Sequence, residues 1–346
     1  MLDYVVVGLG IAGISFCEQL EKQGKTYIVI ADDSQIASKV AGGLYNPVIL
    51  KRFTIAWNAK EQLEKALPFY TSLEKKLNIT LDYKLPVLRR FASIEEQNLW
   101  FEASDKESLK PFLSQEIVPN KNLNIDAPFG YGQVMNTGRI DTEVLITSYT
   151  EYLLAKNNLL QKTFDHEALK ISEDGIRYKS ITAQQIVFAE GFGLKKNPYF
   201  NYLPLTSTKG EYVDVKAPNL KESCAIKSSI FIIPWKEDIY RVGATYKWKD
   251  ITNLPTEESK EELLKKLDAF IKCDYEVVNH VAGIRPTVTD RRPLVGRHPE
   301  HANLYVLNGF GSRGVIIAPF ASEQLLNYIE KDEALHKEMN ISRFTS

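Results

Sequence analysis

The sequence is poor in cysteine, in unbalanced charge and in long apolar runs, and each shortage excludes a class of protein. The 3 cysteines form no C-x-x-C pair, so neither a disulfide framework nor a zinc site is expected. Lys plus Arg number 43 and Asp plus Glu number 44, a balance that gives no overall electrostatic footprint for nucleic acid. Basic doublets such as Arg89-Arg90 are scattered, and we expect them on solvated surface.

Signals for export, membrane insertion and metal binding are also missing. No apolar run approaches the roughly 20 residues that a membrane-spanning helix needs, and no basic region precedes the first apolar run as in a signal peptide. The 5 histidines show no ligand spacing, so no metal is expected. We therefore expect a cytoplasmic protein without a membrane partner. At 346 residues, two domains are the natural division.

A glycine-rich turn near the N-terminus is the most informative local pattern. Residues 4–7 form an apolar, β-branched run typical of a buried parallel strand, and positions 13, 16, 17 and 20 mark one face of a helix. Between them Gly8, Gly10 and Gly13 give G-x-G-x-x-G in the strand-turn-helix context of a dinucleotide-binding unit. The predicted phosphate-binding turn comprises Gly8, Gly10, Ile11, Ala12 and Gly13.

A second strand and an acidic residue complete this unit. Thr26 to Ile30 reads as the strand, and the adjacent Asp32 and Asp33 supply the acid that would bind a ribose hydroxyl. The spacing leaves the choice between the two aspartates open. The motif by itself does not separate NAD from FAD.

Further along, several segments predict helices and loops. Residues 57–77 are amphipathic, with Pro68 as a kink or a break, and Asp141 is a plausible N-cap of another helix. Gly42-Gly43, followed by Asn46-Pro47, marks either an ordinary turn or a loop that contacts a flat cofactor. Residues 81–129 have a mixed pattern that assigns no element.

The remaining segments predict a sheet of a second kind. Residues 168–178 read as a hairpin, and 185–189 as a strand that returns the chain to the nucleotide-binding sheet. Runs at 211–215, 229–234 and 240–246 then predict a largely antiparallel sheet. A helix is expected over 256–272, with its apolar stripe in the core.

Two stretches near the C-terminus, 281–296 and 303–319, make the pattern specific. With the N-terminal motifs they resemble the D-amino-acid oxidase superfamily of FAD-dependent amine oxidases, which includes glycine oxidase and sarcosine oxidase. Gly-Ser-Arg-Gly followed by Ala-Pro is most similar to the oxidase half of bifunctional enzymes that modify the tRNA wobble uridine. The matching pieces are Gly8-x-Gly10-x-x-Gly13, Gly42-Gly43, Ala189-Glu-Gly191, Pro234 with Val242-Gly-Ala-Thr245, Gly283-Ile-Arg-Pro286 and Gly309-Phe-Gly-Ser-Arg-Gly314.

The resemblance implies an α/β fold, with a Rossmann-like FAD-binding domain and a smaller α+β substrate domain built on a largely antiparallel sheet. The FAD-binding domain would comprise 1–80, 135–207 and 283–346, and the substrate domain 81–134 and 208–282. Covalent members carry a cysteine near the C-terminal region, whereas none follows Cys273 here, so noncovalent FAD is expected. Beyond the glycine turn and the two aspartates, the implied FAD contacts are Ser38, Gly42, Gly43, Leu44, Ala168, Ala189, Gly191, Gly309, Gly311, Ser312, Arg313, Gly314 and Val315.

The resemblance also implies a substrate site. Arg285, in Gly-x-Arg-Pro, would bind the carboxylate of a small amine whose hydride passes to the flavin, with oxygen as the acceptor. Arg313 is a further candidate catalytic residue. The alternative for Arg285 is a surface ion pair, and the alternative for Arg313 is a structural contact to a loop. Phe231 stands where glycine oxidase has a substrate-contacting tyrosine, and Tyr246 is a candidate to supply the hydroxyl instead.

Three functions follow. The first is oxidation of an N-substituted, glycine-like amine, and the second is the same chemistry on a tRNA wobble uridine, which the balanced charge does not favour. The third is a non-catalytic flavin-binding role on the same fold.

Overall fold

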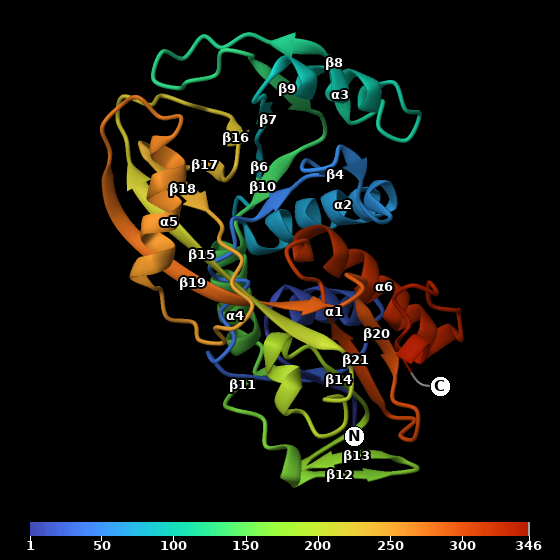
Figure 1. The fold of residues 1–346 in the computed structure, drawn as a ribbon. Helices are drawn as coiled ribbons and strands as arrows, with labels where there is room; N and C mark the ends of the chain where they lie inside the picture. The colour runs from blue at the N-terminus through green and yellow to red at the C-terminus, as the bar shows by residue number, and fades with distance from the viewer. Residues whose placement is uncertain (345–346) are drawn as a thin grey trace.

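The computed structural model describes residues 1–344, and a mainly parallel sheet lies at the centre of its lower half (Figure 1). The apolar runs predicted near Tyr4 and Thr26 are two of its inner strands, and both are buried. The sheet also carries an antiparallel hairpin and an antiparallel edge strand. Its parallel strands, in spatial order, are β11 (Leu159–Gln161), β2 (Tyr27–Ala31), β1 (Leu2–Val7), β14 (Ile181–Phe188) and β21 (Leu304–Asn308); the additions are β12 (Leu169–Ser172) with β13 (Gly175–Tyr178), and β20 (Leu294–Arg297).

Four helices pack in the core around this sheet. The α1 helix buries the predicted face, and Cys17 on it is fully inaccessible, as expected of a small core residue. Asp141 caps α4 as predicted, because its carboxylate accepts a 3.2 Å hydrogen bond from the Val144 amide. Pro68 lies inside α2, so it does not divide that segment into two helices. The helices are α1 (Ile11–Lys22), α2 (Ala59–Leu77), α4 (Thr142–Ala155) and α6 (Gly314–Lys331).

The second large sheet runs from the left side to the top of the molecule in Figure 1 and is antiparallel except for one pair of strands, β16 and β7. The α5 helix (Glu257–Asp268) packs on one face through Leu263 and Leu267, which confirms the predicted core stripe. The strands, in spatial order, are β19 (Glu276–Val288), β15 (Leu205–Lys216), β18 (Ile239–Gly243), β17 (Phe231–Lys236), β16 (Ala225–Lys227), β7 (Val87–Arg90), β9 (Tyr131–Val134) and β8 (Leu113–Val118).

The segment 81–129, to which the sequence assigned no element, supplies the far edge of this sheet and one helix. Arg89 and Arg90 lie here, and the expectation of solvated surface is wrong for them. Their side chains are only 16% and 15% exposed, because they form ion pairs with Glu96 and Asp126. The smaller elements are β3 (Leu44–Tyr45), β4 (Val48–Ile49), β5 (Thr54–Ile55), β6 (Asp82–Lys84), α3 (Ile94–Ser104), β10 (Gly138–Ile140), and the 3₁₀ turns η1 (His166–Ala168), η2 (Gly191–Lys196) and η3 (Ile341–Phe344).

The two long strands β15 and β19 lead from the antiparallel sheet toward the parallel one (Figure 1). The C-terminal end of β19 therefore lies beside the glycine turns of the parallel sheet, so residues of both sheets can line one site. The boundaries of the two domains stay a prediction. Across residues 1–344, none of the helices combines the length and apolarity that crossing a bilayer requires.

Candidate functional site

The glycine turn after β1 is built by backbone packing that excludes side chains at two positions. Gly8 has φ +100°, and a Cβ there would lie 2.4 Å from the Ala189 carbonyl oxygen. A Cβ on Gly13 would lie 2.1 Å from the carbonyl oxygen of Gly8. Both are far below van der Waals contact, so these two glycines hold β1, β14 and α1 together.

Gly10 differs, because its surroundings leave room. The only atoms near a Cβ there belong to the Ser38 side chain, with Oγ at 3.2 Å. No side chain caps the first turn of α1, apart from a long 3.4 Å contact in which the Ile11 amide donates to Ser38 Oγ. An uncapped helix N-terminus beside such a space fits the pyrophosphate of a dinucleotide.

The two candidate acids after β2 lie in different surroundings. Asp32 accepts hydrogen bonds from Ser34 Oγ at 2.6 Å and Thr163 Oγ1 at 2.7 Å. Burial acts to raise its pKa, but these hydrogen bonds outweigh burial and hold the pKa below its usual value. Asp33 is 84% exposed and pairs with Lys39. Asp32 is therefore the more firmly held carboxylate at the end of β2.

The Gly42-Gly43 loop is as tightly packed as the first turn. Gly43 has φ +65°, and a Cβ on it would lie 2.0 Å from the Ile140 carbonyl oxygen. The Ile140 amide donates to the Gly43 carbonyl at 3.0 Å, and Leu44 continues into β3, which pairs with β10. The loop is thus fixed against the antiparallel sheet, where Gly42 meets side chains of β15 and β17.

Ala168 and the Ala189-to-Gly191 segment lie at the ends of neighbouring elements. Ala168 closes the short η1 turn before β12, and Ala189 follows β14. Glu190 joins the two, because His166 Nε2 lies 3.0 Å from one carboxylate oxygen and Asn197 donates to the other at 2.7 Å. No local sequence pattern pointed to this cluster, since His166 lies in η1 whereas Glu190 and Asn197 flank η2.

The last glycine-rich turn brings the N-terminus of α6 beside that of α1. A Cβ on Gly309, which has φ +78°, would lie 2.6 Å from a Val288 methyl group. A Cβ on Gly314 would lie 3.2 Å from the Ile11 side chain, so the first turns of the two helices adjoin. Neither helix has a side-chain cap. Ser312 is exposed on the turn, whereas Val315 is buried and its carbonyl accepts from Tyr70.

Arg313 lies in the same turn and links it to the loop after Gly42-Gly43. Its guanidinium donates to the Asn46 carbonyl at 3.0 Å. Burial lowers the pKa of Arg313 to about 10, which is still high enough for the side chain to be cationic at neutral pH. No carboxylate within residues 1–344 pairs with it.

Arg285 lies on β19 and also has no acidic partner in the described part of the chain. Its guanidinium donates to the Thr245 carbonyl at 3.3 Å and lies 4.8 Å from the centre of the Tyr246 ring. A Cβ on Gly210 would lie 1.9 Å from this guanidinium, so the arginine lies flat across the backbone of β15. The surface ion pair that was the alternative reading of Arg285 is absent from residues 1–344.

Tyr246 lies in a largely exposed loop, residues 244–255, that passes beside Arg285. Tyr246 is 60% and Trp248 55% exposed. The loop is attached to the sheet by Lys209, which is fully buried and donates to Asp250 at 2.6 Å and to the Leu254 carbonyl. No local pattern predicted this anchor, because a lysine in a strand pattern is expected to be solvated.

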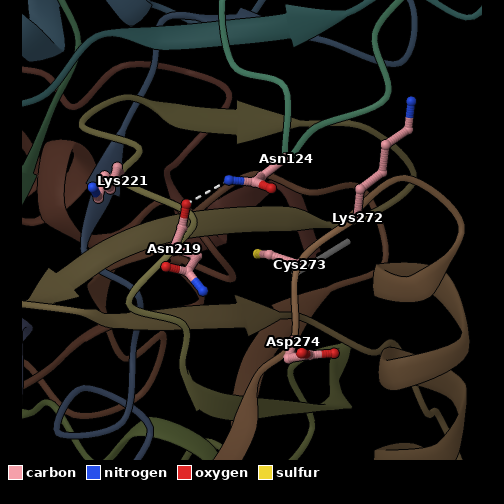
Figure 2. Close-up of a pocket in the computed structure, with 6 residues that line it drawn as sticks. All are labelled: Asn124, Asn219, Lys221, Lys272, Cys273 and Asp274. Carbon is pink, nitrogen blue, oxygen red and sulfur yellow. Dashed lines mark hydrogen bonds between the residues drawn. The ribbon is translucent and has the colours of Figure 1, made fainter.

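A polar hollow of about 400 Å³ lies elsewhere, among loops of the antiparallel sheet (Figure 2). Its lining includes Asn124, which donates to the Asn219 carbonyl at 2.6 Å, and Cys273. It contains none of the predicted site residues, so it does not belong to the site of the glycine turns.

The parallel sheet, its G-x-G-x-x-G turn and the paired helix N-termini define a dinucleotide-binding protein. A family model described as DAO, FAD dependent oxidoreductase, matches residues 3–327. The chain therefore belongs to this family, and the predicted superfamily, cofactor and oxidoreductase class are confirmed.

Individual relatives agree with the family. The chain is 26% identical to glycine oxidase of Bacillus subtilis (strain 168), over 72% of this chain and 69% of the relative. It is 22% identical to the tRNA 5-methylaminomethyl-2-thiouridine biosynthesis bifunctional protein MnmC of Actinobacillus pleuropneumoniae serotype 3 (strain JL03), over 94% of this chain and 55% of the relative. The chain thus spans only about half of this bifunctional relative.

Solved structures confirm the predicted fold. Glycine oxidase from Bacillus cereus ATCC 14579 superposes with a TM-score of 0.82 at 19% identity, covering 97% of this chain and 99% of that one. Iminodiacetate oxidase from Chelativorans sp. BNC1 gives 0.78 at 18% identity, covering 99% and 98%.

Proposed function

We propose that the protein oxidises a primary or secondary amine that carries a carboxylate, using FAD. The observation that carries the proposal is Arg285, a partly buried arginine without an acidic partner among residues 1–344. A guanidinium can hold a carboxylate by two parallel, charge-assisted hydrogen bonds. Because Arg285 lies where β19 approaches the last glycine turn, a carboxylate bound there would be held close to the cofactor.

The residues of the site divide the work in this proposal. The turns at Gly8–Gly13 and Gly309–Gly314, with the Gly42-Gly43 loop, hold FAD, which supplies the hydride acceptor when bound. Arg285 fixes the carboxylate and thereby the carbon next to nitrogen. An amine that binds neutral needs no strong base. The imine product is hydrolysed by water, and oxygen is the proposed final acceptor.

The names of the relatives support this substrate class. Glycine and iminodiacetate, the substrates named for the glycine oxidases and the iminodiacetate oxidase, both combine an amine with a carboxylate. The third alternative, a non-catalytic flavoprotein, provides no reason for a carboxylate-binding guanidinium beside the flavin turns.

The test is anaerobic reduction of the protein-bound flavin by a panel of glycine, N-substituted glycines, iminodiacetate and the corresponding amines without a carboxylate. Bleaching of the flavin by the carboxylate-bearing amines alone is the expected result. Equal bleaching by amines without a carboxylate would remove Arg285 from the mechanism. No bleaching by any amine would favour the non-catalytic alternative.

A second candidate is oxidation of a carboxymethylaminomethyl group on a tRNA wobble uridine. It is favoured by the similarity to MnmC over 94% of this chain. With charges near balance, we expect at most weak tRNA binding that falls steeply with salt. Filter binding at low and physiological salt measures this, and tight binding that survives physiological salt would put the tRNA substrate first.

A further inference from the structure

Tyr212 is a half-buried tyrosine at the junction of the two halves of the molecule. It lies on β15, directly opposite Gly243 of β18. A Cβ on Gly243 would lie 2.4 Å from Tyr212 Cδ1, so the ring occupies the space that this glycine leaves. At its far end the ring reaches the Gly42-Gly43 loop, since a Cβ on Gly42 would lie 3.4 Å from the hydroxyl oxygen.

The hydroxyl of Tyr212 has no hydrogen-bond partner within residues 1–344. Three fully buried tyrosines of the chain do have one. Tyr45 donates to Asp82 at 2.8 Å, Tyr70 to the Val315 carbonyl at 2.7 Å and Tyr149 to Glu18 at 2.7 Å. The free hydroxyl of Tyr212 is therefore available to a ligand.

The strand geometry puts this hydroxyl on the same face as the carboxylate anchor. Arg285 lies across Gly210, and Tyr212 follows Gly210 by two residues, so the two positions share a face and are about 7 Å apart. When a carboxylate is bound by the guanidinium, the nitrogen of a glycine-like substrate is one carbon further away. The nitrogen can then extend along the strand toward Tyr212.

The neighbouring side chains of Phe231 and Tyr246 are less suited to contact the amine. Phe231 pairs with Gly243 from the other side and has no hydroxyl. Tyr246, the candidate that the sequence favoured, is 60% exposed and stacks on Arg285. On this face of β15, Tyr212 carries the hydroxyl that lies against the Gly42-Gly43 loop.

We propose that the Tyr212 hydroxyl accepts a hydrogen bond from the N–H of the bound amine, an inference that rests on the proposed function. During oxidation the C–H bond next to nitrogen breaks, and its hydrogen leaves with the electron pair for the flavin of the bound FAD. The nitrogen lone pair forms the C=N bond, the N–H stays in place, and the nitrogen becomes positive. A hydroxyl acceptor stabilises that positive charge more than it stabilises the neutral amine, so it accelerates the step.

The test is Tyr212→Phe, which keeps the ring over Gly243 and removes the hydroxyl. The rate of anaerobic flavin reduction by a secondary amine such as N-methylglycine should fall about 10- to 100-fold, the range for one hydrogen bond to a charged group. Its tertiary counterpart N,N-dimethylglycine has no N–H when neutral, so its rate should not change. Tyr202→Phe is the matched control, because this partly exposed tyrosine lies beside His298 and away from the site, and it should leave both rates unchanged.

A second measurement uses acetate, which has the carboxylate and no nitrogen. Its affinity, followed by the change in flavin absorbance, should be unchanged in Tyr212→Phe and lost in Arg285→Ala. Equal rates in wild type and Tyr212→Phe would overturn the inference. So would a fall of the same size with both amines, or a lower FAD content, because a structural role would produce these. A wild-type protein that no amine reduces would overturn the proposed function itself, and the inference with it.

Discussion

The proposed site has a cofactor half and a substrate half, and the two differ in which atoms form them. The cofactor half consists of backbone, with glycines at Gly8, Gly13 and Gly43 where a Cβ would lie 2.0 to 2.4 Å from a carbonyl oxygen. The substrate half consists of side chains on a sheet, above all Arg285, which shares its face with Tyr212. A backbone site can be altered only by adding atoms, whereas a side-chain site can be altered by removing a single group. Mutations should therefore separate the two halves cleanly.

The largest effect is expected in the cofactor half, from Gly10→Val. The new side chain projects past Ser38 into the space at the uncapped end of α1, where the pyrophosphate would lie. We expect a folded but almost colourless protein, measured as FAD per chain after acid release. Gly193→Ala is the control, because a Cβ there meets Gln35 at an ordinary 3.6 Å. Full FAD retention in Gly10→Val would contradict the assignment, and flavin left in the acid pellet would contradict noncovalent binding.

The next effect should fall on the substrate half alone. Arg285→Ala removes the cation that lies over Gly210, which should cost about 2–5 kcal/mol of substrate binding and orientation, or roughly 30-fold to several thousand-fold. Arg285→Lys keeps the charge without the fork and should lose less. Anaerobic flavin reduction measures both variants, with FAD content expected to stay at the wild-type level. Loss of FAD or of folding would instead assign Arg285 to the structure, and the division between the halves would fail.

A smaller effect is expected from Lys209→Met, which cuts the attachment of loop 244–255. The substitution leaves Asp250 without its cation and removes the ammonium 3.5 Å from Glu211, which is also fully buried and keeps His280 at 3.0 Å. We expect about 2–3 kcal/mol of destabilisation by chemical denaturation, less than for a fully enclosed pair because the Asp250 side chain is a third exposed. Lys247→Met is the control, since the Lys247 side chain is 31% exposed and its partner Glu258 81% exposed, so the cost should stay below about 1 kcal/mol. Equal costs in the two variants would refute the anchor.

The smallest effect is expected on the unfolding free energy at acidic pH. The hydrogen bond from Lys209 is the main cause that lowers the pKa of Asp250 from 3.8 to about 2. A carboxylate whose pKa is lower in the folded state stabilises the fold above its unfolded pKa. That contribution is lost as the pH falls from about 4 through about 2. The unfolding free energy of Asp250→Asn, compared with wild type at pH 6, 4, 3 and 2, should decline less in this window. An identical decline would show that the loop anchor does not titrate.

The same contrast explains what could be predicted from the sequence. The turn at Gly8–Gly13 and the cap at Asp141 depend on neighbours in the chain, so local spacing was enough to predict them. Lys209 reaches Asp250 across 41 positions, and Tyr212 reaches Gly42 across the junction between the sheets. Such contacts arise from strand pairing and loop docking, which no local pattern encodes. The choice between Asp32 and Asp33 stayed open for a different reason. The two residues are adjacent and of one type, so only their hydrogen-bond and ion-pair partners distinguish them.

The amide of Gly311 donates to the carbonyl of Pro286 at 2.9 Å, directly after Arg285 on β19. The strand β19 therefore carries Arg285, the proposed carboxylate anchor, and binds the turn that precedes α6 through the next residue, Pro286. In the proposed site, the distance between the bound substrate and the flavin is set by the number of residues between Arg285 and the turn. Inserting or deleting one residue in β19 would turn the Arg285 side chain to the other face of the sheet. New substrate preferences can then evolve by exchanging side chains or by reshaping loop 244–255, while the distance from anchor to cofactor is inherited unchanged.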